Sequence, residues 1–242
     1  MCSSDLLAWT GIEKVNMKRL FTFGCSYTSF NWSTWADILG NSAEEFQNWG
    51  MTGGGNQFIF NSVHECNQRN KFQTGDTVIV CWSGTTRMDW YKSGRWSSMG
   101  NVYTQPLFDR NLIDLCADER GFLLRDIVFV EAVRRLLQQS NATWYFLSMV
   151  DFDTGTNKDV VNLYSDTLDC IRPSFETVLK DRKPIQIDLH PTPMEHLTYL
   201  DKVLPEIPVS EHTRLKVAQE DSTIRSAGYK LPPYRLPDIK RL

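Results

Sequence analysis

Short apolar runs alternate with stretches of helical periodicity along most of this chain. Apolar and β-branched runs bounded by polar residues predict β-strands at 19–23, 45–49, 77–82, 143–150 and 183–189. Apolar residues at helical spacing predict helices at 32–39, 56–68, 120–139, 166–179, 193–204 and 211–224, and Pro173 predicts an interruption within the helix at 166–179. Strands that alternate with helices in this way are typical of a parallel sheet covered by helices. The pattern therefore predicts an α/β fold.

The order of these elements suggests where the chain divides. Residues 17–204 contain all the predicted strands and form the expected main domain, preceded by an N-terminal extension (1–16) and followed by a C-terminal tail (205–242). Within the domain, residues 85–119 are aromatic, polar and irregular. A connection of that length in a compact domain is usually functional, so we predict an insertion or lid there.

Composition narrows the classes of function. The 242 residues carry a net charge of −3, which gives no electrostatic reason to expect nucleic acid or an anionic membrane as a partner. Six cysteines lie far apart without a CxxC pair, a spacing that predicts no zinc site and fits a reducing compartment. The sequence shows no secretory leader and no apolar run of the ~20 residues that cross a bilayer. We expect a cytoplasmic protein that uses neither a metal nor a cofactor.

The exit of the first predicted strand is the first candidate for chemistry. Its sequence, Phe-Thr-Phe-Gly-Cys-Ser-Tyr-Thr, places Ser26 in a turn at the carboxyl edge of the sheet. A serine hydroxyl is a weak nucleophile unless a base lies within hydrogen-bond reach, and the backbone N–H at such a turn can stabilise an oxyanion. A capping serine in an ordinary turn is the competing interpretation. Cys25 is an alternative nucleophile, disfavoured because its side chain points to the opposite side if the strand continues.

A glycine-rich stretch is the second candidate. Residues 48–56 read Asn-Trp-Gly-Met-Thr-Gly-Gly-Gly-Asn, and glycine lets backbone N–H groups approach a ligand. The stretch has neither the Lys-Ser/Thr ending of a phosphate-binding loop nor a clean GxGxxG. One interpretation is an oxyanion or substrate site that includes Gly53 and Asn56. The other is a turn before a helix that Asn56 caps.

The third candidate is a histidine near the far end of the domain. A histidine acts as a base when a carboxylate or carbonyl holds its other ring nitrogen, and Asp188 lies two residues before His190. Pro191 stiffens the chain directly after this histidine. His196 lies on the following predicted helix, where a packing or capping role is the simpler interpretation.

Taken in chain order, these three blocks resemble those of the SGNH (GDSL-type) hydrolases over about residues 17–204. The resemblance implies a flavodoxin-like three-layer α/β/α sandwich with a central, mostly parallel sheet, and the activity of an esterase, lipase or carbohydrate deacetylase. It implies that Ser26 is the nucleophile and first oxyanion donor and that Gly53 is the second donor. It also implies that His190 is the general base and that Asp188 orients it.

The chain departs from this family pattern at three places. Cys25 replaces the aspartate that usually precedes the serine, and the spacing of Asp188 and His190 is one residue shorter than the common one. After the strand at 77–82 the usual oxyanion asparagine is missing. Loss of one oxyanion donor typically costs ~3 kcal/mol of transition-state stabilisation. Thr85 and Ser83 are alternative candidates for the replacement donor, and Arg87 is a candidate to stabilise negative charge or to bind an acidic substrate.

The sequence thus predicts a serine esterase or acylhydrolase that forms an acyl-enzyme intermediate. Its expected substrate is a small-molecule or carbohydrate ester, such as an acetylated sugar. Acyl transfer to a sugar or another alcohol uses the same residues, and a non-catalytic binding or structural protein on the same fold is the alternative of a different class. Aromatic residues of the insertion either line the substrate cleft or pack the insertion onto the body: Trp90, Tyr91, Trp96, Tyr103 and Phe108.

Overall fold

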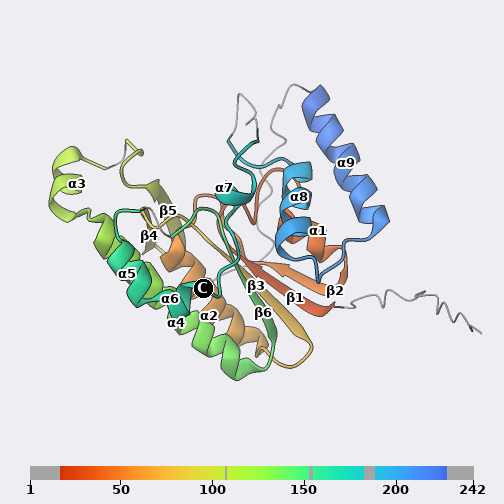
Figure 1. Cartoon of the computed structure of the whole chain (residues 1–242), viewed down its shortest axis with the longest axis horizontal. Helices are drawn as coiled ribbons and strands as arrows, with labels where there is room; N and C mark the ends of the chain where they lie inside the picture. Colours follow the sequence, from red (N-terminus) through yellow and green to blue (C-terminus); the bar gives the residue numbers. More distant parts are fainter. Residues whose placement is uncertain (1–16, 107, 153–154, 183–188, 228–242) are drawn as a thin grey trace, which may run out of the picture.

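A four-stranded parallel sheet forms the centre of the computed structural model, which describes residues 17–106, 108–152, 155–182 and 189–227. Its strand order is β2-β1-β3-β6, and every neighbouring pair is parallel (Figure 1). The strands are β1 (Met17–Phe23), β2 (Ala43–Asn48), β3 (Asp76–Trp82) and β6 (Thr143–Ser148). The predicted α/β fold class is confirmed.

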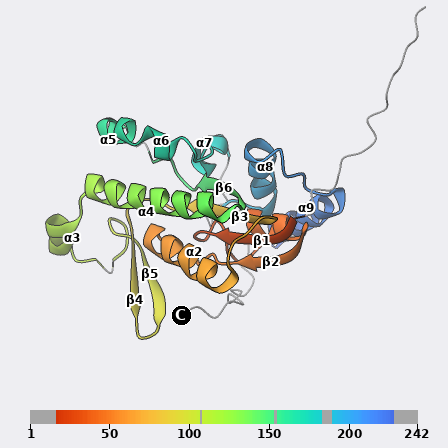
Figure 2. The same cartoon turned by 90° about the horizontal axis from the view of Figure 1, so that it is seen from below.

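Helices cover both faces of this sheet, so the molecule has three layers. Val78, Val80 and Trp82 of β3 pack on one face against α2 (Asn56–Asn70) and α4 (Glu119–Ser140). Ile79 and Cys81 point to the other face and pack against α1 (Trp35–Gly40) and α8 (Pro193–Val203). All seven residues of β3 are buried, as expected for a strand with helices on both sides. Figure 2 shows α2 and α4 side by side on one side of the sheet.

The second half of the chain contains shorter helices than the sequence predicts. The helix predicted at 166–179 is interrupted at Pro173 as expected, and consists of the short helices α6 (Ser165–Leu168) and α7 (Phe175–Val178) on either side of it, because proline disrupts a helix interior. The preceding α5 (Lys158–Leu163) was not predicted. Most of the strand predicted at 183–189 lies outside the described residues.

The segment at 85–119 has regular structure that its composition did not reveal. It contains a hairpin of β4 (Arg87–Lys92) and β5 (Arg95–Asn101), followed by α3 (Arg110–Cys116). Asp89 of β4 is buried at the start of α2, where its carboxylate accepts hydrogen bonds from the N–H groups of Gly55 (2.8 Å) and Phe58 (2.9 Å). A carboxylate at this position satisfies free helix N–H groups and complements the helix dipole. The hairpin is thereby fixed next to the glycine-rich stretch.

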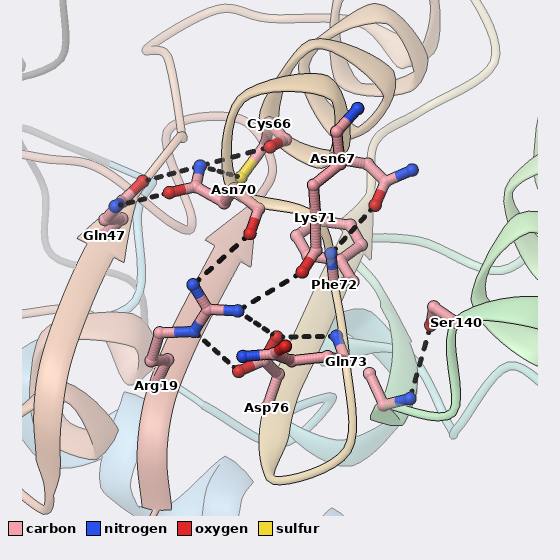
Figure 3. A network of polar contacts seen from close by, with 11 residues as sticks. Arg19, Gln47, Cys66, Asn67, Asn70, Lys71, Phe72, Gln73, Asp76 and Ser140 are labelled. Carbon is pink, nitrogen blue, oxygen red and sulfur yellow. Dashed lines mark hydrogen bonds and ion pairs between the residues drawn. The ribbon is translucent and has the colours of Figure 1, made fainter.

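A polar network ties the amino-terminal edge of the sheet together (Figure 3). Arg19 of β1 donates two hydrogen bonds to Asp76 at the start of β3, at 2.7 and 2.6 Å. The same guanidinium lies 3.4 Å from the carbonyl oxygens of Asn70 and Lys71, at the end of α2. Asp76 is 1% exposed, and its partners satisfy a charge that would otherwise be costly to bury. The network lies at the edge of the sheet opposite to the carboxyl ends of the strands.

The described part of the predicted tail packs on the main domain. Helix α9 (Glu211–Ser226) lies against α8, and Arg214 on α9 forms a double ion pair with Asp201 on α8. No helix in the described ranges combines the length and the apolar character that crossing a membrane requires.

Candidate active site

Ser26 and His190, which lie far apart in the sequence, meet at the carboxyl edge of the sheet. The Ser26 Oγ and His190 Nε2 atoms are 2.7 Å apart. Ser26 belongs to the turn that follows β1, where the N–H groups of Thr28 and Ser29 donate to the Cys25 carbonyl at 2.9 and 3.1 Å. His190 lies just before α8. The structure therefore brings the predicted hydroxyl and the predicted imidazole into hydrogen-bond contact.

The glycine before this turn is required by a close backbone approach. A Cβ atom on Gly24 would overlap Thr28 Oγ1 and would lie 3.0 Å from the carbonyl oxygen of Cys81 on β3. Only glycine allows the turn to fold against the neighbouring strand in this way. The position of Ser26 thus depends on the Gly-Cys-Ser order seen in the sequence.

The glycine-rich stretch lies directly beside the Ser26 turn. The Met51 N–H donates to the carbonyl of Gly24 at 3.0 Å. Gly53 has φ +80°, a left-handed conformation that favours glycine. Within the described residues, the N–H groups of Ser26 and Gly53 donate to no protein acceptor. Both N–H groups therefore lie in or beside the Ser26 turn without an acceptor among the described residues.

Asn56, a predicted oxyanion or substrate residue, faces the protein interior. Its side-chain amide donates to the carbonyl of Ser83 (3.0 Å), its side-chain oxygen accepts from the Ser83 N–H (2.7 Å), and the amide also donates to Asp126 Oδ2 (2.6 Å). Asn56 and Asp126 are both fully buried. These contacts hold the start of the loop after β3 against α2 and α4.

Thr85 and Arg87, two of the candidates to replace the missing asparagine, lie in different places. Thr85 lines a cavity of about 260 Å³ whose described lining includes neither Ser26 nor His190. Arg87 Nη1 instead donates to the Gly54 carbonyl at 3.1 Å, and its Nη2 lies 3.5 Å from Met149 Sδ. That sulfur is 3.8 Å from Cys25 Sγ. Arg87 therefore contacts the glycine-rich stretch directly and the Ser26 turn through Met149, whereas Thr85 contacts neither in the bonds described.

Aromatic side chains surround the His190 ring. Phe30 stacks on the His190 ring with ring centroids 4.0 Å apart and an interplanar angle of 20°. The centroid of the Tyr27 ring lies 5.7 Å from that of His190, in an edge-to-face arrangement. Trp32 Nε1 donates to the carbonyl of Pro191 at 2.9 Å. Sequence reasoning missed Phe30 and Trp32, although two aromatic residues soon after a candidate nucleophile are a visible signal. Asp188, the predicted orienting residue, lies outside the described residues.

The second histidine near the site is a packing residue. His196 is 1% exposed and lies edge-on to the rings of Tyr27 and Phe175. Burial lowers the pKa of His196 to about 3, and the neighbouring His190 and Arg182 act in the same direction. The ring is neutral at physiological pH.

A cavity of about 330 Å³ lies beside the Ser26 turn, and its lining among the described residues includes neither Ser26 nor His190. Tyr27 and Pro191, the residues that follow Ser26 and His190 in sequence, both line it. The remaining lining is mostly apolar and also contains three charged residues: Met149, Val150, Phe175, Glu176, Leu179, Lys180, Arg182 and Leu189. Within the described ranges, no three histidine, cysteine or acidic side chains gather where they could hold a metal ion.

Comparisons with known proteins find similar solved structures at low sequence identity. No protein-family model matches the sequence, and no curated protein matches it significantly. The structure is similar to a member of the lipolytic G-D-S-L family from Veillonella parvula, with 12% identity over 76% of this chain and 97% of that chain (TM-score 0.46). It is also similar to the psychrotrophic esterase EstA from Pseudoalteromonas, with 9% identity over 76% and 95% (TM-score 0.44). The parallel sheet and its two helical layers establish a three-layer α/β/α sandwich, and the similarities to these solved structures concern the fold alone.

Proposed function

We propose that this protein is a serine-dependent ester hydrolase. The observation that supports this most directly is the 2.7 Å separation of Ser26 Oγ and His190 Nε2. A nucleophile within hydrogen-bond reach of a base is the arrangement that covalent catalysis at an ester requires. A serine that only capped a turn would need no imidazole at this distance.

The proposed reaction has two halves. His190 Nε2 accepts the proton of Ser26 Oγ as the oxygen attacks the ester carbonyl, and the same nitrogen then returns that proton to the leaving alcohol. Water attacks the resulting acyl-enzyme with His190 again as base, which releases the acid and restores the serine. Asp188 is the proposed residue that orients the ring and stabilises its protonated form.

Two backbone groups and one side chain are proposed to stabilise the oxyanion. The N–H groups of Ser26 and Gly53 have no protein acceptor among the described residues, and a preorganised donor of this kind is worth ~3 kcal/mol in the transition state. Arg87 adds a positive charge whose guanidinium already contacts the Gly54 carbonyl. A fixed charge in a site that excludes water acts strongly on a developing negative charge, so Arg87 is the proposed substitute for the missing asparagine.

The cavity beside the Ser26 turn indicates the size and character of the substrate. Its volume of about 330 Å³ and its mainly apolar lining fit a short acyl group or a compact alcohol. Trp90 and Tyr91 on the hairpin are about half exposed, at 49% and 52%. Exposed aromatic faces suit sugar rings, so an acetylated carbohydrate is the proposed natural substrate.

Labelling with a fluorophosphonate probe, together with p-nitrophenyl acetate turnover, tests this function. We expect the probe to modify Ser26, Ser26→Ala to abolish labelling, and His190→Ala to reduce it strongly. Ser29→Ala, in the same turn, is the matched control and leaves labelling intact, and Cys25→Ala separates the serine from the neighbouring thiol. An unlabelled, inactive wild-type protein would overturn the hydrolase and favour a binding protein on the same fold.

Acyl transfer is a second candidate, because Ser26 is only 3% exposed. A nucleophile shielded from bulk water gives an acceptor alcohol an advantage in the second half-reaction. Adding sugars to the p-nitrophenyl acetate reaction and measuring the ratio of acylated sugar to free acetate by mass spectrometry distinguishes transfer from hydrolysis.

A further inference from the structure

Helix α9 contributes to a small cluster next to the candidate base. Ile224 on this helix packs with Phe30 and Trp32 in a buried group that is separate from the two large clusters on the faces of the sheet. The rings of Phe30 and Trp32 meet edge-to-face, with centroids 4.7 Å apart and an interplanar angle of 73°. This is a favourable aromatic geometry, so the two rings support one another.

The same two aromatic residues hold His190 in two ways. Phe30 lies flat on the imidazole at a centroid distance of 4.0 Å, which fixes the plane of the ring. Trp32 Nε1 donates to the carbonyl of Pro191 at 2.9 Å, which fixes the backbone directly after His190. A hydrogen bond between Ser26 Oγ and His190 Nε2 needs both the ring plane and the backbone position to be correct.

Polar contacts keep α9 in register with the elements on either side. Glu220 Oε1 accepts from the Ser33 N–H at 3.1 Å, which ties α9 to the segment after the Ser26 turn. Asp221 Oδ1 accepts from the Met194 N–H at 3.3 Å, which ties α9 to the start of α8. The helix thus bridges the two chain segments that carry Ser26 and His190.

We propose that Phe30 and Trp32 are positioning residues for His190, and that α9 holds both in place through Ile224. Neither aromatic side chain takes part in bond making. Their contribution is to keep Nε2 at the distance from Ser26 that proton transfer requires, and a displacement of about 1 Å at such a site costs on the order of 100-fold in rate. This inference rests on the proposed function and assigns a role in it to the C-terminal helix.

The chain provides a matched control on the same helix. Val217 lies on α9 and is buried like Ile224, but it packs in the large cluster with α1 and α8. Ile224→Ala and Val217→Ala both remove apolar contacts from α9, and only Ile224→Ala loosens the Phe30–Trp32 pair. Phe30→Leu removes the stacking directly, whereas Phe30→Tyr keeps an aromatic face over the imidazole.

The experiment compares kcat and KM for p-nitrophenyl acetate in these full-length variants, with folded fractions measured by urea titration. We expect Phe30→Leu and Ile224→Ala to lower kcat about tenfold or more with KM changed less than about twofold, because positioning acts on the transition state. Phe30→Tyr restores most of kcat, and Val217→Ala changes stability without a comparable change in kcat. If Ile224→Ala does not fold, Ile224→Val makes the same test with a smaller loss.

A second readout does not depend on turnover. Imidazole ¹⁵N NMR reports whether His190 Nε2 stays hydrogen-bonded, and we expect that signature in the wild type and in Phe30→Tyr but not in Phe30→Leu. An unchanged kcat and an unchanged ¹⁵N signature in folded Phe30→Leu would overturn the positioning role. An inactive wild type that keeps the Phe30-dependent signature would overturn the proposed hydrolase and still support positioning.

Discussion

Asp126 on α4 should make the protein less stable as the pH rises. Its side chain is fully buried, where Oδ2 accepts from Asn56 at 2.6 Å and Oδ1 accepts from Arg125 Nε at 2.7 Å. Burial raises the pKa of Asp126 to about 6, against an ordinary value of 3.8, although Arg125 and Asn56 both lower it. The nearby carboxylate of Asp89 raises it further. Burial prevails because the Asp126 carboxylate is fully buried while the Arg125 guanidinium is partly exposed. The free energy needed to remove the carboxylate from water therefore exceeds the attraction between the two charges.

The sign of the effect follows from proton linkage. Between about pH 4 and about pH 6 the folded protein keeps the Asp126 proton that the unfolded chain has released, so rising pH favours the unfolded chain. A difference of about 2 pKa units corresponds to about 3 kcal/mol. The contribution of Asp126 to the free energy of unfolding therefore falls by about 3 kcal/mol across this window and is constant above it.

Urea unfolding of the wild type and Asp126→Asn at a series of pH values isolates this contribution, because asparagine does not titrate. We expect the stability of the wild type relative to the variant to decline from about pH 4 to about pH 6. Asp159→Asn is the control with the opposite sign. Hydrogen bonds from Arg120 lower the pKa of Asp159 at the surface, so its stabilising contribution grows with pH and stays small.

A stability difference that rises with pH would refute the reasoning. It would mean that Arg125 outweighs burial and holds the pKa of Asp126 below 3.8. A flat difference would mean that the site admits enough water to remove the desolvation cost.

Three further predictions follow from burial and packing. Gly24→Ala should lower the free energy of unfolding by about 1–3 kcal/mol, because the added Cβ overpacks the turn. Gly84→Ala is the control: its added Cβ meets nothing closer than 3.6 Å and should change the free energy of unfolding by less than about 1 kcal/mol. Thermal unfolding measures both variants. In the wild type, the pKa of His196 is about 3 in the folded protein, whereas the unfolded chain takes up a proton below about pH 6.5, so acid lowers the free energy of unfolding. His196→Phe should abolish this pH dependence, which urea titrations at about pH 5 and pH 8 measure. Among the cysteines of the described ranges, Cys116 is exposed and should react first with a thiol reagent, whereas burial raises the pKa of Cys66 and protects it, as peptide mapping after brief labelling would show.

The core of the fold was predictable because its strands and long helices have strong periodic patterns. The uninterrupted run at 77–82 indicated a strand buried on both faces, and β3 is buried at every position. The hairpin of β4 and β5 was missed for the opposite reason. Its strands are mostly only partly buried, and the feature that fixes the hairpin is the buried carboxylate of Asp89 at the start of α2. Such a tertiary contact leaves no periodic signal in the sequence.

The candidate site was predictable to the extent that it depends on strand exits. Ser26 and Gly53 follow neighbouring parallel strands, and parallel strands end at a common edge, so their proximity follows from the fold class. The partners of Asn56 did not follow in this way, since its side chain bonds to Ser83 and Asp126 across two other elements. The stack of Phe30 on His190 likewise depends on how α8 and α9 close over the turn.

The hairpin also decides which groups are left to stabilise an oxyanion. The first N–H groups of a helix are a natural site for negative charge, but at the start of α2 Asp89 already accepts from Gly55 and Phe58. A second negative charge at that helix end would be repelled by the buried carboxylate. On the proposed mechanism, the oxyanion must therefore rely on the Ser26 and Gly53 N–H groups, which precede the helix. Arg87 lies two residues before Asp89 on the same strand and donates to the Gly54 carbonyl. On the proposed mechanism, the hairpin therefore removes the helix end as a source of oxyanion stabilisation and offers the positive charge of Arg87 in its place.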